Sequence, residues 1–355
     1  MNIVSWKGTD RCVWSLEAFL LGLMLSGACS EKHATERPAP EAEVVRLDFT
    51  AGIATDAAPS TRATVDGSVF PPRTDAYLIG MWVCRHEEDP AEFIPAMDGY
   101  ENLRAALYAT GSTTGGDYEQ RWQYTFDGLQ HDILNVVRRT AIDIYAYYPR
   151  QSSEPGAEFD PTAVPFRSGS TDWMWAAPLQ FAGEELSGSS VSAPLVFGHA
   201  MTCLEIRIRC LYAGTVNLTS MTLTDKKKRL YTSGTMNIVD RTLDLNDADL
   251  SETLTVSPGT RLQTTYLKFH LIMPPVADYE DGDFTLSFVF NGKPAETQFA
   301  VPNRMTSLTD GSEVTVSEFE SGKRYIYSLT LDNTLHFLPV GVDDTWETEE
   351  FELEL

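Results

Sequence analysis

The chain has 355 residues, which is enough for two domains that each bury a core of their own. It carries 51 acidic and 27 basic residues, so its formal net charge is −24. Such an acidic protein is repelled by phosphate, which argues against general binding to nucleic acids or anionic lipids. Its five cysteines form no Cys-x-x-Cys motif and no zinc-like cluster with histidine, so we expect no metal and no cofactor.

The N-terminal segment has the pattern of an export signal. An apolar run, residues 13–25, follows two basic residues and ends shortly before Cys29. A cysteine after small residues at this point resembles the lipid-attachment site of a bacterial lipoprotein, although Ser26 stands where leucine is usual. We expect removal of residues 1–28 and lipidation of Cys29. An ordinary secretory signal or a short buried helix with an incidental cysteine remain the alternatives.

A strand and a protease site are predicted next. Residues 44–49 alternate between apolar and polar side chains, which predicts an amphipathic strand. Its apolar face consists of Val45, Leu47 and Phe49. A loose segment, residues 52–60, leads to Arg62, and an exposed arginine in such a loop is where a trypsin-like protease cuts. Arg46 is the alternative site, but a cut there would split the strand.

Period-two alternation dominates the rest of the chain and predicts many short strands. More continuously apolar runs predict central strands at residues 78–83, 142–148, 266–273 and 284–290. Asn291-Gly292 predicts a tight hairpin turn, and a slip of period near residues 218–221 predicts a bulge. Residues 100–107 fit a helix and a strand equally well.

This pattern predicts an all-β protein built from two β-sandwich domains in tandem. The serine-rich segment 187–192 is the best candidate for a linker between them. We therefore expect a first domain at residues 63–190, which the strand at 44–49 completes before processing, and a second domain at residues 191–355.

No catalytic signature accompanies these strands, so we do not expect an enzyme. None of the six histidines lies in a Gly-x-Ser-x-Gly or His-Glu-x-x-His context. The acidic segment 244–249 lacks the glycine of a calcium loop, and a solvated turn is the better interpretation. Trp173 and Trp175 would share one face of a strand, either as part of a core or as platforms on which sugar rings stack.

The end of the sequence is a second amphipathic segment. Its apolar residues, which alternate with glutamates, are Phe351, Leu353 and Leu355. A strand of this kind either pairs within its own domain or adds to the sheet of another molecule.

Five segments together resemble the fimbrillins of Bacteroidetes, subunits of the type V pilus. In chain order they are residues 61–71, 143–149, 172–176, 197–201 and 319–327. Their order and spacing extend the resemblance over most of the chain from about residue 44 onward.

The resemblance implies an outer-membrane lipoprotein precursor with two transthyretin-like, Greek-key β-sandwich domains. The lipidated propeptide would span residues 29–62, and an arginine-specific protease would cut after Arg62. The strand at 44–49 would then leave with the lipid anchor, and the segment ending in Phe351, Leu353 and Leu355 from another subunit would replace it.

Further expectations concern the partners of such a subunit. They are other pilus subunits in a head-to-tail polymer and a host or bacterial surface ligand for adhesion. A stalk position is favoured over a tip, because a tip needs a groove but no donor strand. The alternative function is a surface lipoprotein that binds glycans through Trp173 or Trp175.

Overall fold

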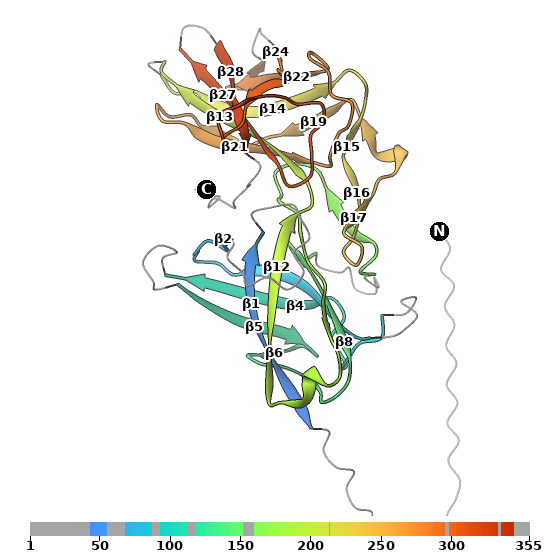
Figure 1. The fold of residues 1–355 in the computed structure, drawn as a ribbon. Coiled ribbons are helices and arrows are strands. Elements are labelled where there is room, and N and C mark those ends of the chain that lie inside the picture. Colours follow the sequence, from blue (N-terminus) through green and yellow to red (C-terminus); the bar gives the residue numbers. More distant parts are fainter. Residues whose placement is uncertain are drawn as a thin grey trace, which may run out of the picture. The chain divides into compact units, whose positions relative to one another are not determined.

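The computed structural model describes residues 43–54, 68–86, 93–111, 118–151, 160–212, 214–294, 298–332 and 335–343. The fold is all-β, as predicted, and the described residues contain only two 3₁₀ turns besides strands and loops (Figure 1). Within these residues, no helix has the length and apolarity needed to cross a lipid bilayer.

The strands up to residue 199, with one 3₁₀ turn, are β1 (Val44–Ile53), β2 (Ser68–Val69), β3 (Tyr77–Arg85), β4 (Leu103–Thr110), β5 (Glu119–Phe126), β6 (Leu129–His131), β7 (Leu134–Val137), β8 (Ile142–Tyr148), β9 (Val164–Arg167), β10 (Met174–Ala176), β11 (Leu179–Phe181), η1 (Glu185–Ser187) and β12 (Ser190–His199). Those that follow are β13 (Thr202–Cys210), β14 (Asn217–Asp225), β15 (Leu230–Tyr231), β16 (Ser233–Asn237), β17 (Thr242–Asp244), η2 (Asp247–Asp249), β18 (Leu250–Ser251), β19 (Thr253–Val256), β20 (Thr260–Arg261), β21 (Leu267–Met273), β22 (Phe284–Phe290), β23 (Lys293–Pro294), β24 (Phe299–Ala300), β25 (Arg304–Thr306), β26 (Glu313–Thr315), β27 (Arg324–Leu331) and β28 (Leu335–Asp343).

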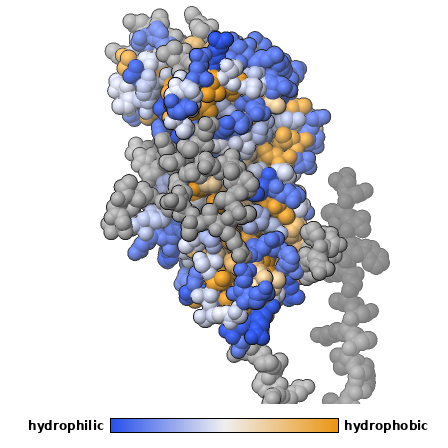
Figure 2. Space-filling view, in the orientation of Figure 1, coloured by the Kyte–Doolittle hydropathy of each residue, from blue (hydrophilic) through white to orange (hydrophobic). Residues whose placement is uncertain are grey.

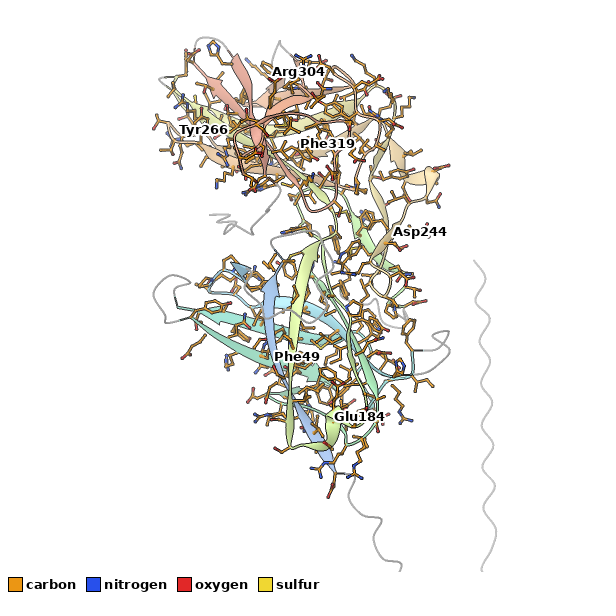
Figure 3. All side chains as sticks on the ribbon, in the orientation of Figure 1. Phe49, Glu184, Asp244, Tyr266, Arg304 and Phe319 are labelled. Carbon is orange, nitrogen blue, oxygen red and sulfur yellow. The ribbon has the colours of Figure 1, made fainter. Side chains whose placement is uncertain are left out.

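The first sheet folds over on itself and encloses a core. Its strand order is β2-β1-β12-β10-β8-β3-β4-β5-β6, with β7 beside β1 and β11 beside β8. Phe49 of β1 nevertheless contacts Trp122 and Tyr124 of β5, with ring centroids 5.9 and 6.0 Å apart. Figure 3 shows Phe49 among the strands of this sheet. Strands that are distant in the sheet order therefore face each other across one hydrophobic core.

A second core lies between two further sheets. One has the order β21-β13-β27-β28, and the other has the order β19-β14-β22-β23 with β20 and β24 at its sides. Alternate side chains of β13, including Leu204 and Ile206, meet Leu223 of β14 and Leu286 of β22 in this core. Phe319, labelled in Figure 3, stacks on Tyr279 with a centroid distance of 4.7 Å. This arrangement is a β-sandwich.

A smaller cluster joins the two halves of the chain. Trp82 and Tyr147 from the first half share it with Cys203 and Ile272 from the second. A three-stranded sheet of the order β17-β16-β9 also takes strands from both halves. Apolar side chains are largely withdrawn into these clusters, and the exposed face in Figure 2 is mostly hydrophilic with small apolar patches.

The predicted linker is wrong. Residues 187–192 contain the end of η1 and the start of β12, and β12 pairs along its length with β1. Serines on the exposed positions of this strand made its sequence resemble a loop, while Ala193, Leu195 and Phe197 fill the first core. We propose that the chain has two domains and that their boundary lies after His199 rather than near residue 190.

Of the other local predictions, the turn and the bulge are confirmed, the helix-or-strand ambiguity is resolved, and one strand position is wrong. The turn at Asn291-Gly292 has positive φ at both residues, 49° and 74°, as the hairpin requires. A register shift between Leu218 and Ser220 is the predicted bulge. Residues 103–110 are a strand, not a helix. The strand predicted as central at 266–273 lies at a sheet edge instead.

Candidate functional site

The first strand, β1, is held on both sides. On one side it runs parallel to β12, from Arg46 opposite Ser190 to Ile53 opposite Phe197. On the other side it pairs antiparallel with β7 over its first part and with β2 at Gly52 and Ile53. Figure 1 shows β1 in blue alongside the yellow-green β12. The strand is an integral part of the sheet even though it comes first in the described chain.

One face of β1 supplies side chains to the core. Val45, Leu47, Phe49, Ala51 and Ile53 each have an exposed fraction of at most 7%. Burying a large apolar side chain stabilises a fold by about 1.5–3 kcal/mol. Removal of β1 therefore opens an apolar groove between β12 and the strands on its other side, with unpaired backbone groups along it.

A side chain bridges β1 and β5 where no strand does. Among the described residues, β7 and β2 leave residues 48–51 of β1 without a neighbouring strand on that side. There the amide of Gln120 accepts a hydrogen bond from the Ala51 N–H at 2.9 Å and donates one to the Ala51 carbonyl at 2.6 Å. Its second N–H donates to the Tyr118 hydroxyl, which donates to the Phe70 carbonyl, both at 2.9 Å.

Sequence reasoning missed Gln120, although a signal was present. Gln120 occupies the same alternating face of β5 as Trp122 and Tyr124. A polar side chain on an otherwise apolar face needs a hydrogen-bond partner, but the sequence does not say which one.

Arg46, the alternative processing site, lies in the middle of this pairing. Its backbone N–H donates to the Ser189 carbonyl at 3.0 Å, and Asn135 of β7 lies opposite it on the other side. Its side chain pairs with Asp48 at the surface. The other predicted site residues, Cys29, Arg62, Phe351, Leu353 and Leu355, lie outside the described residues.

The two tryptophans offered as sugar platforms are turned inward. Trp173 has an exposed fraction of 4%, and its indole N–H donates to the Arg167 carbonyl at 2.9 Å. Trp175 packs, partly buried, against the same cluster of side chains. The geometry therefore favours the core interpretation of this pair.

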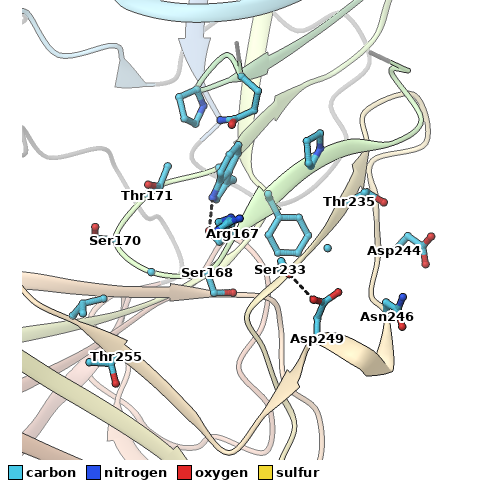
Figure 4. Close-up of a pocket in the computed structure, with 18 of the residues that line it drawn as sticks. Arg167, Ser168, Ser170, Thr171, Ser233, Thr235, Asp244, Asn246, Asp249 and Thr255 are labelled. Atoms are coloured by element: carbon cyan, nitrogen blue, oxygen red, sulfur yellow. Dashed lines mark hydrogen bonds between the residues drawn. The ribbon is translucent and has the colours of Figure 1, made fainter. Parts of the chain in front are cut away.

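A pocket lies beside Trp173. Its volume is about 1040 Å³, and β9, β16, β17 and β19 contribute to its wall (Figure 4). Polar and apolar atoms share its wall about equally, and the Asp249 carboxylate accepts a hydrogen bond from Ser233 at 2.7 Å. The rings of Phe166 and Trp173 are only 2% and 4% exposed, so neither offers a face for stacking. Within the described residues, no group of three His, Cys, Asp or Glu side chains is placed to hold a metal ion.

A buried charge network lies near the last described residues. Glu205 of β13 is fully buried and contacts Arg324 of β27 at 3.2 Å, Arg207 at 2.5 Å and His270 at 3.4 Å. Arg324 also pairs with Asp343 at the end of β28. Burial raises the pKa of Glu205, but hydrogen bonds from His270 and Arg207 and the charge of Arg324 outweigh it and lower the pKa to about 2.

Comparisons with known proteins point in one direction. Residues 80–345 match the model of a protein family described as fimbrillin-like. A proposed cell adhesion protein of Bacteroides ovatus superposes with a TM-score of 0.50 at 17% identity, over 86% of this chain and 99% of that chain. A proposed cell adhesion protein of Bacteroides fragilis superposes with a TM-score of 0.50 at 13% identity, over 86% of this chain and 99% of that chain. At such identities the superpositions establish similarity of fold alone. No curated protein matches the sequence.

Proposed function

Because this chain belongs to the fimbrillin-like family, we propose that it is a structural, non-enzymatic subunit of a cell-surface fimbria that polymerises by exchange of β-strands. The observation that carries the proposal is β1. It fills the first core with one face, is paired on both sides, and connects to the rest of the chain through residues 55–67. One cut in that connection makes β1 a separate fragment.

The proposed cut follows Arg62 and is made by an arginine-specific protease. Proteases bind their substrates as extended backbone with free hydrogen-bonding groups. Arg46 does not offer this, because neighbouring strands flank it on both sides. Arg62 belongs to the connection between β1 and β2, and a cut there leaves β1 intact.

Strand replacement is the proposed route to the filament. The groove left by β1 takes the C-terminal segment of another copy, which inserts Phe351, Leu353 and Leu355. Each buried apolar side chain contributes about 1.5–3 kcal/mol, and each ladder hydrogen bond contributes about 0.5–1.5 kcal/mol. Ordering the segment costs about 1–2 kcal/mol per residue. Contacts around the inserted strand must therefore add to its stability.

Insertion of one molecule's tail into the next is a head-to-tail contact. Such a contact does not close on itself and produces an open filament. A molecule with both a groove and a donor segment belongs in the stalk, which is the position we propose. Its partners are further pilus subunits, and the filament contributes to adhesion to a host or bacterial surface.

Export precedes assembly in this proposal. Residues 1–28 are removed, Cys29 carries a lipid that anchors the precursor to the outer membrane, and the cut after Arg62 releases the anchor together with β1. The competing proposal, a glycan-binding lipoprotein, depended on exposed indoles at Trp173 and Trp175. The burial of Trp173 and the packing of Trp175 remove that support.

Limited proteolysis tests the proposal. Trypsin should cut the folded precursor between residues 55 and 67, and mass spectrometry should find a mature chain that begins at Ala63. An Arg62→Gln variant should resist this cut, whereas an Arg46→Gln variant should behave as the wild type. Negative-stain microscopy should then show filaments after trypsin treatment of the wild type and of Arg46→Gln, and none for Arg62→Gln. A mature protein that keeps β1 and still forms filaments would contradict strand exchange.

A further inference from the structure

Gln120 forms two hydrogen bonds with β1, both with backbone atoms of Ala51. Its carbonyl oxygen accepts from the Ala51 N–H and its amide donates to the Ala51 carbonyl. A neighbouring strand in an antiparallel ladder exchanges the same two hydrogen bonds with a residue opposite it. The amide thus takes the place of a strand at the gap between β7 and β2.

This contact does not depend on which side chain occupies the position. Every non-proline residue carries the same backbone N–H donor and C=O acceptor. Any strand that binds in the groove in the right register can therefore make both hydrogen bonds. When β1 leaves, the amide loses two of its partners inside a partly buried groove, which is unfavourable until another backbone takes their place.

The amide is also held ready by its surroundings. Its remaining N–H donates to the Tyr118 hydroxyl at 2.9 Å, and Tyr118 in turn donates to the carbonyl of the buried Phe70. Neither partner belongs to β1. The amide therefore has one hydrogen-bond partner outside β1 that restricts its orientation, which reduces the entropy lost on binding.

We propose that Gln120 is the docking point that sets the position of the incoming strand from a second copy of this chain. The inference rests on the proposed function, because it names a residue through which strand exchange operates. One backbone residue of the donor segment occupies the place of Ala51 and makes the same two hydrogen bonds. An apolar side chain cannot fix the register of a strand in this way, because it forms no hydrogen bonds with the backbone.

A shape-matched pair of variants tests the inference. Gln120→Met keeps the length of the side chain and removes both hydrogen bonds. Gln123→Met on the same strand is the control, because Gln123 alternates with Gln120 and lies on the opposite face of β5. Full-length chains that show cooperative thermal unfolding are cut with trypsin, and binding of a synthetic peptide of residues 344–355 is measured. Two hydrogen bonds predict about 10-fold weaker binding for Gln120→Met and an unchanged affinity for Gln123→Met.

Backbone methylation of the peptide gives a second readout. We use a series of peptides, each of which carries one backbone N-methyl group. For one of these peptides, the methyl group should weaken binding to the wild type and to Gln123→Met but not to Gln120→Met. The methylated residue of that peptide occupies the place of Ala51. Methylation of peptide residues that hydrogen-bond to β12 should weaken binding equally in both variants. If Gln120 had a merely structural role, methylation at every position would have an equal effect in both variants.

The wild type provides a measurement that needs no substitution. In NMR spectra, the Gln120 side-chain amide protons should be protected from exchange with solvent in the precursor. Protection should fall after β1 is released and return when the peptide binds.

The outcomes separate the two proposals. If the cut wild type binds no peptide, strand exchange fails and the role of Gln120 fails with it. If the wild type binds the peptide, but Gln120→Met binds equally well and the amide protons stay unprotected, only the role of Gln120 is overturned.

Discussion

Several buried charged side chains of this fold belong to networks of ion pairs. Glu205 is fully buried, but it contacts Arg207, His270 and Arg324 and stays ionised because of them. A second network at the turn after β14 pairs Arg229 with both Asp225 and Asp283. Such groups link the stability of the fold to pH.

Glu205 should make the protein less stable in acid. Its folded pKa of about 2 lies below the ordinary value of 4.5, so its contribution is complete above pH 4.5 and is lost as the pH falls towards 2. The shift corresponds to about 3 kcal/mol. Urea unfolding at several pH values should therefore show Glu205→Gln strongly destabilised at pH 7, and the difference from wild type should shrink by about this amount near pH 2. The exposed Glu119→Gln is the control and should unfold at pH 7 at nearly the same urea concentration as the wild type.

Gly80 is required by a close approach between two strands. A methyl group at Gly80 of β3 would lie 2.0 Å from the ring of Tyr147, which is fully buried on the neighbouring β8. Gly80→Ala should therefore destabilise the fold by about 1–3 kcal/mol or more in chemical denaturation. Gly198→Ala in β12 is a matched control, because nothing lies within 4 Å of the added atom. Equal stabilities of the two variants would contradict the packing shown here.

At the scale of elements, β1 should matter to the precursor and not to the filament. Phe49 packs against Trp122 and Tyr124, so Phe49→Ala should cost the precursor about 3–5 kcal/mol. Filaments assembled from the Phe49→Ala variant should dissociate at the same denaturant concentration as wild-type filaments, because neither filament contains β1. Trp122→Ala on β5 should destabilise both the precursor and the filaments. A filament weakened by Phe49→Ala would mean that β1 is retained.

The strands whose sequences were most regular were predicted best. β1 presents one alternating apolar face to the first core, whereas β8 is buried on both faces, which is why its apolar run is nearly continuous. β12 was mistaken for a linker because small residues and serines occupy its exposed positions, and nothing local shows that β1 will pair with it. β4 was ambiguous because its residues fit both periods, and only its pairing with β3 and β5 decides the matter.

The candidate site was predictable only in part. The strand with Val45, Leu47 and Phe49 is recognisable from alternation, whereas Gln120 is 69 residues from Ala51 in sequence and its role depends on how the sheet folds over. The hydrogen bond from the Trp173 indole to the Arg167 carbonyl, only six residues away in sequence, was not predicted either. Long-range polar contacts follow from topology, which a single sequence does not reveal.

At the scale of the whole molecule, assembly should depend on the tail and folding should not. Replacing Phe351, Leu353 and Leu355 with serine should leave the thermal unfolding of the monomer unchanged, because in the proposed filament these side chains fill the groove of a neighbouring copy and not the cores of their own chain. Polymerisation after trypsin treatment, followed by light scattering, should be abolished. Replacing the alternating Glu350, Glu352 and Glu354 with glutamine is the control and should leave polymerisation intact. Filaments from the serine variant would rule out the donor segment.

The strand beside β1 has a mechanical consequence for a filament built this way. β12 continues through Ala200 and Met201 directly into β13, which pairs in parallel with β27, and β27 pairs with β28. A strand seated in the place of β1 is thus connected to the chain's C-terminal exit through consecutive ladders of backbone hydrogen bonds. Tension applied along the fibre would pass from ladder to ladder, and flexible loops would carry little of it.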